Sequence, residues 1–211
     1  MAASFAEDIP EDNLNEDVDH LRVAWVNELN SPEILDFKGE LLEDMFEQVQ
    51  NQQAFVDEIA RDQAKMTEER AFANKLYQME IDRIKYMIAS YLRIRLAKIE
   101  KHTRHVLAVL VSRLSQAEVD YATKYLEMLE SHFNDLALSK FPLEQRKLDA
   151  PDMIDTPDLD LFVFCQSQED IGQVQCDDRG AEHINVRKGD RHVLRYRAVQ
   201  SFVNDGTMAL L

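Results

Sequence analysis

Two histidines and a group of aspartates are the residues of this chain whose types and spacing could bind a metal ion. His102 and His105 are three positions apart on an expected helix, where they could share one face. A metal site needs further ligands at matching positions, and the neighbouring Lys101 and Arg104 oppose a bound cation. We interpret the pair as surface histidines near a bend in the helix.

A calcium site is the second possibility. The aspartates lack the spacing of a calcium-binding loop and its distal bidentate glutamate. We therefore interpret them as a solvated hinge: Asp149, Asp152, Asp155, Asp158 and Asp160. Cys165 and Cys176 form no CxxC pair, which argues against a zinc site or a disulfide framework.

Catalytic motifs are missing from the sequence. It contains no GxGxxG or GxxxxGK[ST] phosphate loop, no GxSxG elbow and no HExxH motif. The sequence therefore predicts no enzyme, no cofactor and no metal.

A basic run is the remaining candidate for chemistry. Between Arg83 and Arg104, seven Lys or Arg residues stand against one acid, Glu100, in a chain whose net charge is −16. These cations could contact DNA phosphates, pair with acidic helices of the same chain, or serve an interface through Arg95, which projects among apolar residues and needs a carboxylate. We favour the last two interpretations, because the net charge repels phosphates and no aromatic stacking platform accompanies the run.

The composition indicates a mainly helical chain. Its 211 residues include only five Gly and five Pro. The N-terminus lacks the basic start and apolar run of a signal peptide, and no window resembles a transmembrane span. We expect an N-terminal helical bundle domain followed by a small C-terminal β domain.

Four segments are predicted: an acidic disordered tail (1–15), a helical domain (16–141), a linker (142–157) and a small β domain (158–211). The tail has a second interpretation, in which Phe5, Ile9 and Leu14 dock as a helix into a partner's groove.

Local signals place the elements within these segments. A helix is expected from Asn15, another opened by Ser31-Pro32-Glu33, and a long one from about Thr67 that bends near His102–His105. Ser115 and Glu118 have the spacing of a capping box. The helix after it carries Ala122, Leu126, Leu129, Phe133 and Leu136 on one side.

In the β domain, residues 184–187 and 192–199 are expected to form a hairpin with its turn at Gly189. A helical turn at Ser201–Asn204 and a last strand at 207–211 follow. The apolar C-terminus suggests that the end of the chain is docked.

The helix at 75–101 is apolar on nearly every side. Tyr77, Ile84 and Leu92 lie on one broad arc, whereas Met87 and Met79 lie on others. A helix on the outside of a lone domain carries one apolar stripe, so this excess predicts packing against other subunits.

Four segments resemble one known family closely. They are LRVAWVNELNSPEIL (21–35), YQMEIDRIKYMIASYLRIRLAKIEK (77–101), DLDLFVFCQ (158–166) and HVLRYRAVQSFVNDGTMALL (192–211). They are similar to the Sld-five family of subunits of the GINS complex, which joins the MCM ring and the Cdc-forty-five protein in the eukaryotic replicative helicase.

The resemblance implies a nuclear, non-catalytic scaffold that assembles with three Psf subunits into a heterotetramer. It places Tyr91, Arg93, Arg95, Lys98 and Ile99 in a signature helix, and it matches Leu210 and Leu211 to the family's apolar end. With the apolar arcs, this gives the predicted partner-binding residues: Tyr77, Met79, Ile84, Met87, Ile88, Tyr91, Leu92, Arg93, Arg95, Lys98, Ile99, Leu210 and Leu211. A DNA-contacting module using Arg83–Arg104 is the alternative function.

Overall fold

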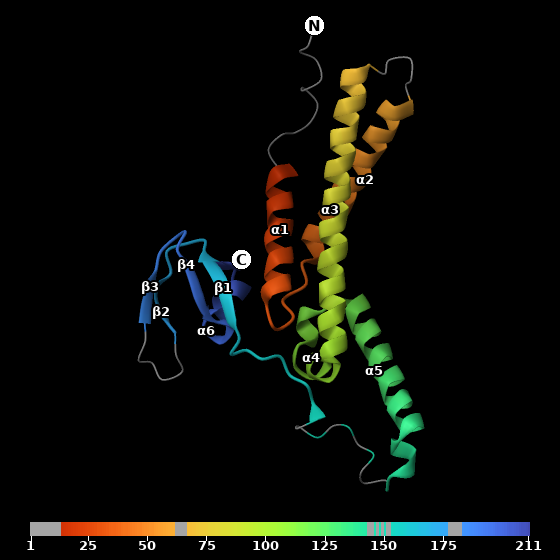
Figure 1. The fold of residues 1–211 in the computed structure, drawn as a ribbon, viewed down its shortest axis with the longest axis vertical. Helices are drawn as coiled ribbons and strands as arrows, with labels where there is room; N and C mark the ends of the chain where they lie inside the picture. Colours follow the sequence, from red (N-terminus) through yellow and green to blue (C-terminus); the bar gives the residue numbers. More distant parts are fainter. Residues whose placement is uncertain are drawn as a thin grey trace. The chain divides into compact units, whose positions relative to one another are not determined.

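The computed structural model describes residues 14–61, 67–142, 146, 148, 150, 153–176 and 183–211. Six helices, two short 3₁₀ turns and five strands follow one another within these ranges (Figure 1). The helical part comprises α1 (Leu14–Asn30), α2 (Gly39–Arg61), α3 (Glu68–Lys101), α4 (Thr103–Val109), η2 (Val111–Arg113), α5 (Gln116–Leu136) and η3 (Leu138–Lys140). The C-terminal part comprises β1 (Phe162–Ser167), β2 (Gly172–Gln175), β3 (His183–Val186), β4 (Arg191–Arg195), α6 (Tyr196–Asn204) and β5 (Met208–Leu210). The predicted fold class, mainly helical with a small C-terminal β domain, is confirmed.

The chain divides into two compact units: Met1–Trp25 with Lys38–Tyr91, and Val26–Phe37 with Leu92–Leu211. The division passes through α1 and α3 and does not follow the predicted linker at 142–157. Residues 1–13 of the predicted tail and part of the linker lie outside the described residues, so the predicted segment boundaries stay a prediction. Among the described helices, none has the length and apolar character needed to cross a membrane.

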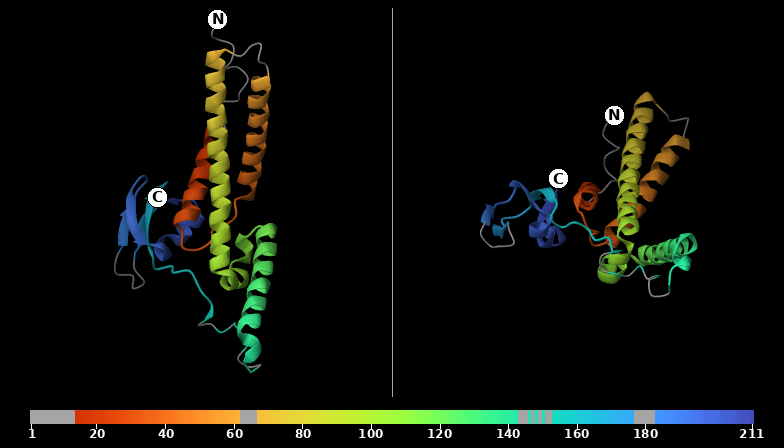
Figure 2. Two further views of the ribbon diagram at one scale, coloured as in Figure 1. Left: turned by 45° about the vertical axis from the view of Figure 1, so that its right-hand side comes forward. Right: turned by 60° about the horizontal axis from the view of Figure 1, so that its bottom comes forward.

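In the first unit, α2 runs beside the first part of α3 (Figures 1 and 2). The buried stripe of α2 is Leu42, Met45, Val49 and Val56. Two side-chain contacts join these helices. The amides of Gln53 and Gln78 form a hydrogen bond of 2.9 Å, and the rings of Phe55 and Tyr77 meet edge to face at 6.5 Å.

The segment that links α1 and α2 corrects one expectation. Ser31-Pro32-Glu33 does not open a helix; residues 31–38 are non-helical, and α2 begins only at Gly39. The Ser31 hydroxyl bonds the Glu33 carbonyl instead of capping a helical turn. Side chains from distant elements bond the backbone of this segment in place of helical hydrogen bonds.

The predicted interruption of the long helix is confirmed at His102, where α3 ends and α4 begins. The Thr103 hydroxyl bonds the Ile99 carbonyl at 2.7 Å across this break. The capping box is also confirmed: the Ser115 hydroxyl accepts from the Glu118 amide, and the Glu118 carboxylate accepts from the Ser115 amide.

The β domain has a three-stranded antiparallel sheet, ordered β4-β1-β5, and a separate β2-β3 pair. The predicted hairpin is therefore wrong. The turn at Gly189 exists, with a positive φ of 86° that suits glycine. However, β3 pairs with β2 and β4 pairs with β1, because Gly189 donates to Ser167 and Ser167 to Asp190, which ties the turn to β1.

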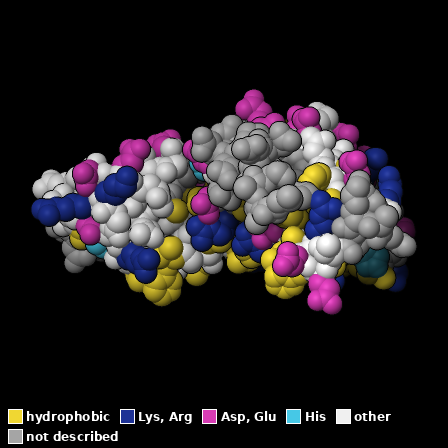
Figure 3. Space-filling view, turned by 90° about the horizontal axis from the view of Figure 1, so that it is seen from above, with side chains coloured by type: hydrophobic (Ala, Val, Ile, Leu, Met, Phe, Trp, Pro, Cys, Tyr) yellow, Lys and Arg dark blue, Asp and Glu magenta, His cyan; other side chains and the backbone are white. Residues whose placement is uncertain are grey.

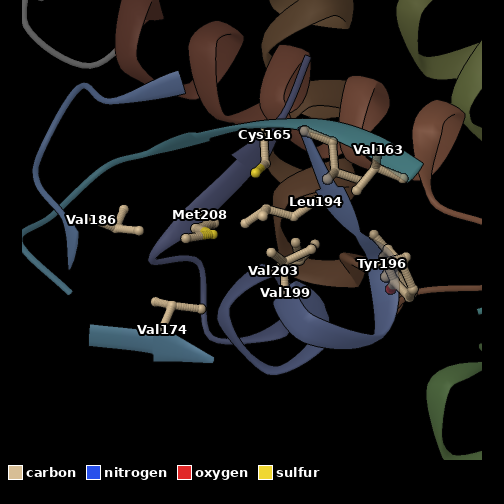
Figure 4. Packing of buried hydrophobic residues seen from close by; sticks show 11 residues of the cluster. Val163, Cys165, Val174, Val186, Leu194, Tyr196, Val199, Val203 and Met208 are labelled. Atoms are coloured by element: carbon tan, nitrogen blue, oxygen red, sulfur yellow. The ribbon is translucent and has the colours of Figure 1, made fainter. Parts of the chain in front are cut away.

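The core of the β domain explains why the predicted strand at 192–199 ends early. Residues expected to extend the strand to position 199 form α6, whose buried Tyr196, Val199 and Val203 follow helical spacing. Val199 and Val203 point toward Leu194 and Met208 of the strands (Figure 4). The sheet and α6 thus enclose one apolar core.

The C-terminus docks as expected. Leu210 is 2% exposed in β5, and its amide donates to the Asn27 side chain at 2.7 Å, whereas Leu211 is 47% exposed. Leu210→Ala should lower the free energy of unfolding by about 2–5 kcal/mol, because it leaves a cavity in a packed core.

Leu211→Ala is the matched control and should change stability by less than about 0.5 kcal/mol. Urea denaturation followed by circular dichroism distinguishes the two. Equal losses would show that the last strand is not packed as described.

Candidate protein-interaction site

The thirteen predicted partner-binding residues fall into three groups. Four are exposed (Tyr77, Met79, Arg93 and Leu211) and two are half-buried (Leu92 and Lys98). The chain itself buries the other seven: Ile84, Met87, Ile88, Tyr91, Arg95, Ile99 and Leu210. The assignment of all thirteen as partner-binding residues stays a prediction, and for these seven the structure shows that their own chain covers the side chain.

Arg95 is a charged side chain that is bonded entirely within the interior of the chain. It is 0% exposed, and its guanidinium makes two hydrogen bonds to Glu118, at 2.7 and 3.1 Å, and one to Glu28 at 3.1 Å. It also donates to the carbonyls of Leu35 at 2.7 Å and Arg113 at 2.9 Å. The carboxylates that Arg95 requires come from its own chain, so its charge needs no carboxylate from a partner; its role at an interface stays a prediction.

Lys98 extends the same network by one helical turn. Its ammonium contacts a Glu28 carboxylate oxygen at 2.8 Å, the Ser31 hydroxyl at 3.0 Å and the Glu33 carbonyl at 2.8 Å, and it bonds the Glu28 carbonyl. Burial lowers the pKa of Lys98, although the nearby Glu28 opposes the shift. Arg95 and Lys98 of α3 thus donate hydrogen bonds to backbone carbonyls of the segment after Ser31, which the sequence predicted to be helical.

Glu33 links this segment to the β domain. One of its carboxylate oxygens accepts from the Tyr196 hydroxyl at 3.0 Å and the Gln200 amide at 2.6 Å, and it lies 3.0 Å from Arg113. Burial, reinforced by Glu33, raises the pKa of Tyr196, so its hydroxyl stays protonated and donates. Residues 27–35 therefore contact α3, η2 and the β domain at once.

The sequence's metal candidates are engaged in other contacts. His102 is buried, which corrects its interpretation as a surface residue, and its Nδ1 lies 3.1 Å from the Asp155 carbonyl. Burial lowers the pKa of His105, and the electrostatic effect of the nearby His102 lowers it further. Within the described ranges, no three His, Cys, Asp or Glu side chains gather as a metal site.

Among the aspartates of the predicted hinge, Asp160 accepts hydrogen bonds from Arg197 through both carboxylate oxygens at 3.1 Å. Hydrogen bonding to Arg197 lowers the pKa of Asp160. Asp149 and Asp152 lie outside the described residues.

Most of the basic run is also used internally. Arg83 pairs with Glu80 at 2.6 Å, Lys85 bonds Gln53 at 2.8 Å and Arg104 pairs with Glu130 at 2.7 Å. With Arg95 and Lys98, five of the seven cations have partners in the chain, which supports the intramolecular interpretation. Arg93 and Lys101 are exposed and have no ion-pair partner among the described residues.

What remains open on α3 is a second apolar stripe. Phe72, Leu76, Met79 and Tyr86 follow one another at positions i, i+4, i+7 and i+14 and are all exposed, between 49% and 67%. The buried stripe of the same helix, from Ile81 to Ile99, lies on another side. The helix is apolar on nearly every side because one stripe is buried inside the chain, whereas this one, which we call the α3 stripe, stays about half exposed or more. Within it, the Tyr86 ring also meets Trp25 edge to face at 6.2 Å.

Helix α5 also carries exposed apolar side chains. The expected stripe of this helix is buried at Ala122 and half-buried at Leu126 and Leu129, but Phe133 and Leu136 are 42% and 58% exposed. The sequence suggested a single covered face here. Only the structure shows that the apolar stripe of α5 is buried or half-buried as far as Leu129 and exposed beyond it.

Exposed apolar stripes on helices favour protein partners over small-molecule chemistry. Of the α3 stripe, only Met79 was on the predicted list. Phe72 and Tyr86 were missed, although their spacing from Met79 was visible in the sequence.

Two family models match the chain. One, described as the GINS complex protein helical bundle domain, matches residues 40–137. The other, described as the DNA replication complex GINS protein SLD5 C-terminus, matches residues 157–211.

Several relatives carry the name DNA replication complex GINS protein SLD5. The Homo sapiens protein is 32% identical, with 92% of this chain and 88% of the relative covered. The Arabidopsis thaliana protein is 33% identical, and the Dictyostelium discoideum protein 29%; in both cases 92% of this chain and 91% of the relative are covered.

The buried network gives a direct prediction. Arg95→Ala should lower the free energy of unfolding by about 3–5 kcal/mol, because Glu118 would stay buried without its charge partner and Glu28 would keep only Lys98. Arg93→Ala, two residues away on the exposed side of α3, should change it by less than about 0.5 kcal/mol. Guanidinium denaturation of both variants checks the difference, and a mild effect of Arg95→Ala would refute the role of the network.

Proposed function

Since this chain belongs to the SLD5 family of GINS complex proteins, we propose that it is a non-catalytic structural subunit of the GINS heterotetramer. Its partners there are three Psf subunits. Through the assembled complex it supports the MCM ring and the Cdc-forty-five protein during replication in the nucleus. Any contact with DNA is indirect.

The observation that carries the proposal is the α3 stripe together with the uncovered end of the α5 stripe. Each surface is a row of large apolar side chains on a rigid helix, which is the form that helix-to-helix packing between subunits requires. Phe72, Leu76, Met79 and Tyr86 are 49–67% exposed. Since full burial of a large apolar side chain contributes about 1.5–3 kcal/mol, covering their exposed parts would contribute roughly 3–7 kcal/mol gross. Association costs about 4–15 kcal/mol, so the α3 stripe supplies one part of the interface and further contacts in the complex supply the rest.

The internal use of the basic residues supports a scaffold rather than a DNA-binding module. Ion pairs within the chain neutralise the charges that phosphates would need, and the net charge of −16 repels a phosphate backbone. The proposal of a non-catalytic role rests on the family's description and on the missing catalytic motifs in the sequence.

Co-expression with the three Psf subunits tests the proposal. Leu76→Asp and Met79→Asp should each reduce the yield of the four-subunit complex at least tenfold, because a carboxylate would have to be buried in an apolar contact. Both residues are exposed in the chain, so circular dichroism of the variants should be unchanged. Native mass spectrometry of the purified material reports the subunit composition.

Ala89→Asp is the matched control, because Ala89 is exposed on α3 away from the stripe. It should assemble like the unmodified chain. A stable, monodisperse monomer that does not co-purify with Psf subunits would overturn the proposal.

A further inference from the structure

The outer face of the three-stranded sheet carries exposed apolar side chains that the fold does not use. The strand register places Phe162 and Phe164 of β1 opposite Arg195 and Val193 of β4. All four point away from the core, since their neighbours Val163, Cys165 and Leu194 are buried. Phe162 and Phe164 are 66% and 63% exposed, and Val193 is 50% exposed.

The C-terminus extends this surface on its other side. The Leu211 amide donates to the Phe164 carbonyl at 3.0 Å, which places the exposed Leu211 next to Phe164. We call these residues the outer face: Phe162, Phe164, Arg191, Val193, Arg195 and Leu211. In Figure 3, hydrophobic side chains gather beside Lys or Arg side chains on the β domain, at the lower left.

Two arginines border the apolar residues. Arg191 is exposed and has no ion-pair partner among the described residues. Arg195 lies over the Phe162 ring, 5.6 Å from its centroid, and 3.8 Å from Asp160. In a chain of net charge −16, this small surface therefore combines apolar area with an unbalanced positive charge at Arg191.

We propose that the outer face binds a segment of another protein that presents apolar side chains next to carboxylates. The apolar side chains cover Phe164, Val193 and Leu211, and a carboxylate pairs with Arg191. Such a contact would use strands of the β domain rather than the helical stripes invoked for subunit assembly.

Charge argues against a second copy of this chain in the same place. A two-fold contact of outer face with outer face would place the arginines of both copies in one contact, and Asp160, the carboxylate beside Arg195, already bonds Arg197 through both oxygens. A nucleic acid is disfavoured as well. The Arg195 guanidinium already lies over the Phe162 ring, where a base would stack, and Asp160 beside it repels phosphates.

Fluorescence anisotropy with the full-length chain tests the proposal. Three fluorescein-labelled probes are compared: a 12-residue peptide alternating leucine and aspartate, a matched peptide alternating leucine and lysine, and a 12-nucleotide oligothymidylate. The aspartate peptide should bind at least tenfold more tightly than the other two. Arg191→Glu and Phe164→Ser should each weaken its binding at least tenfold.

Lys188→Glu makes the same charge reversal at an exposed residue of the turn beside the sheet and should change the affinity less than twofold. Equal binding of the two peptides, tighter binding of the oligonucleotide, or an unchanged affinity in Arg191→Glu would each overturn the proposal. So would the absence of binding by every probe, or a concentration-dependent dimer abolished by Phe164→Ser. Normal assembly with Psf subunits by these variants keeps the result separate from the proposed function.

Discussion

A guanidinium in a protein interior must have its charge balanced and its donors bonded, and Arg95 meets both demands with groups from α1, the segment after it, η2 and α5. These elements are distant in sequence, so satisfying one side chain fixes the positions of several backbones together. Removing any partner would leave a buried charge or carbonyl without compensation, which costs more than the net value of the contact. The geometry around α3 is therefore strongly constrained.

The need to bond these buried cations also accounts for the non-helical segment after α1. Its carbonyls accept from Arg95, Lys98 and Arg113, and these bonds replace the helical hydrogen bonds that the backbone gives up. Because the Glu33 side chain then reaches Tyr196 and Gln200, the segment also holds the β domain. A short stretch without regular secondary structure thus joins the helical elements and the sheet within one compact unit.

Since five of the seven cations between Arg83 and Arg104 are paired within the chain, the exposed surface that remains on α3 is largely apolar. Helix α3 illustrates the division: one side is interior, from Ile81 to Ile99, and the α3 stripe is open. The outer face of the sheet is the second kind of open surface, mixed rather than purely apolar. The two surfaces differ in chemistry and lie on different elements.

The sequence by itself determined α1, α3, α5, the break at His102, the capping box at Ser115 and the turn at Gly189, because each follows from contacts between residues a few positions apart. It also indicated the family, through motifs spread over most of the chain. Only the tertiary structure decided that β3 and β4 take other partners, that Ser31-Pro32-Glu33 stays non-helical and that Tyr196 begins a helix. It likewise decided that Arg95 finds its carboxylates inside the chain and that Phe72 and Phe133 remain uncovered. Those outcomes depend on which distant groups come together, and the local pattern of apolar and charged residues is compatible with more than one such arrangement.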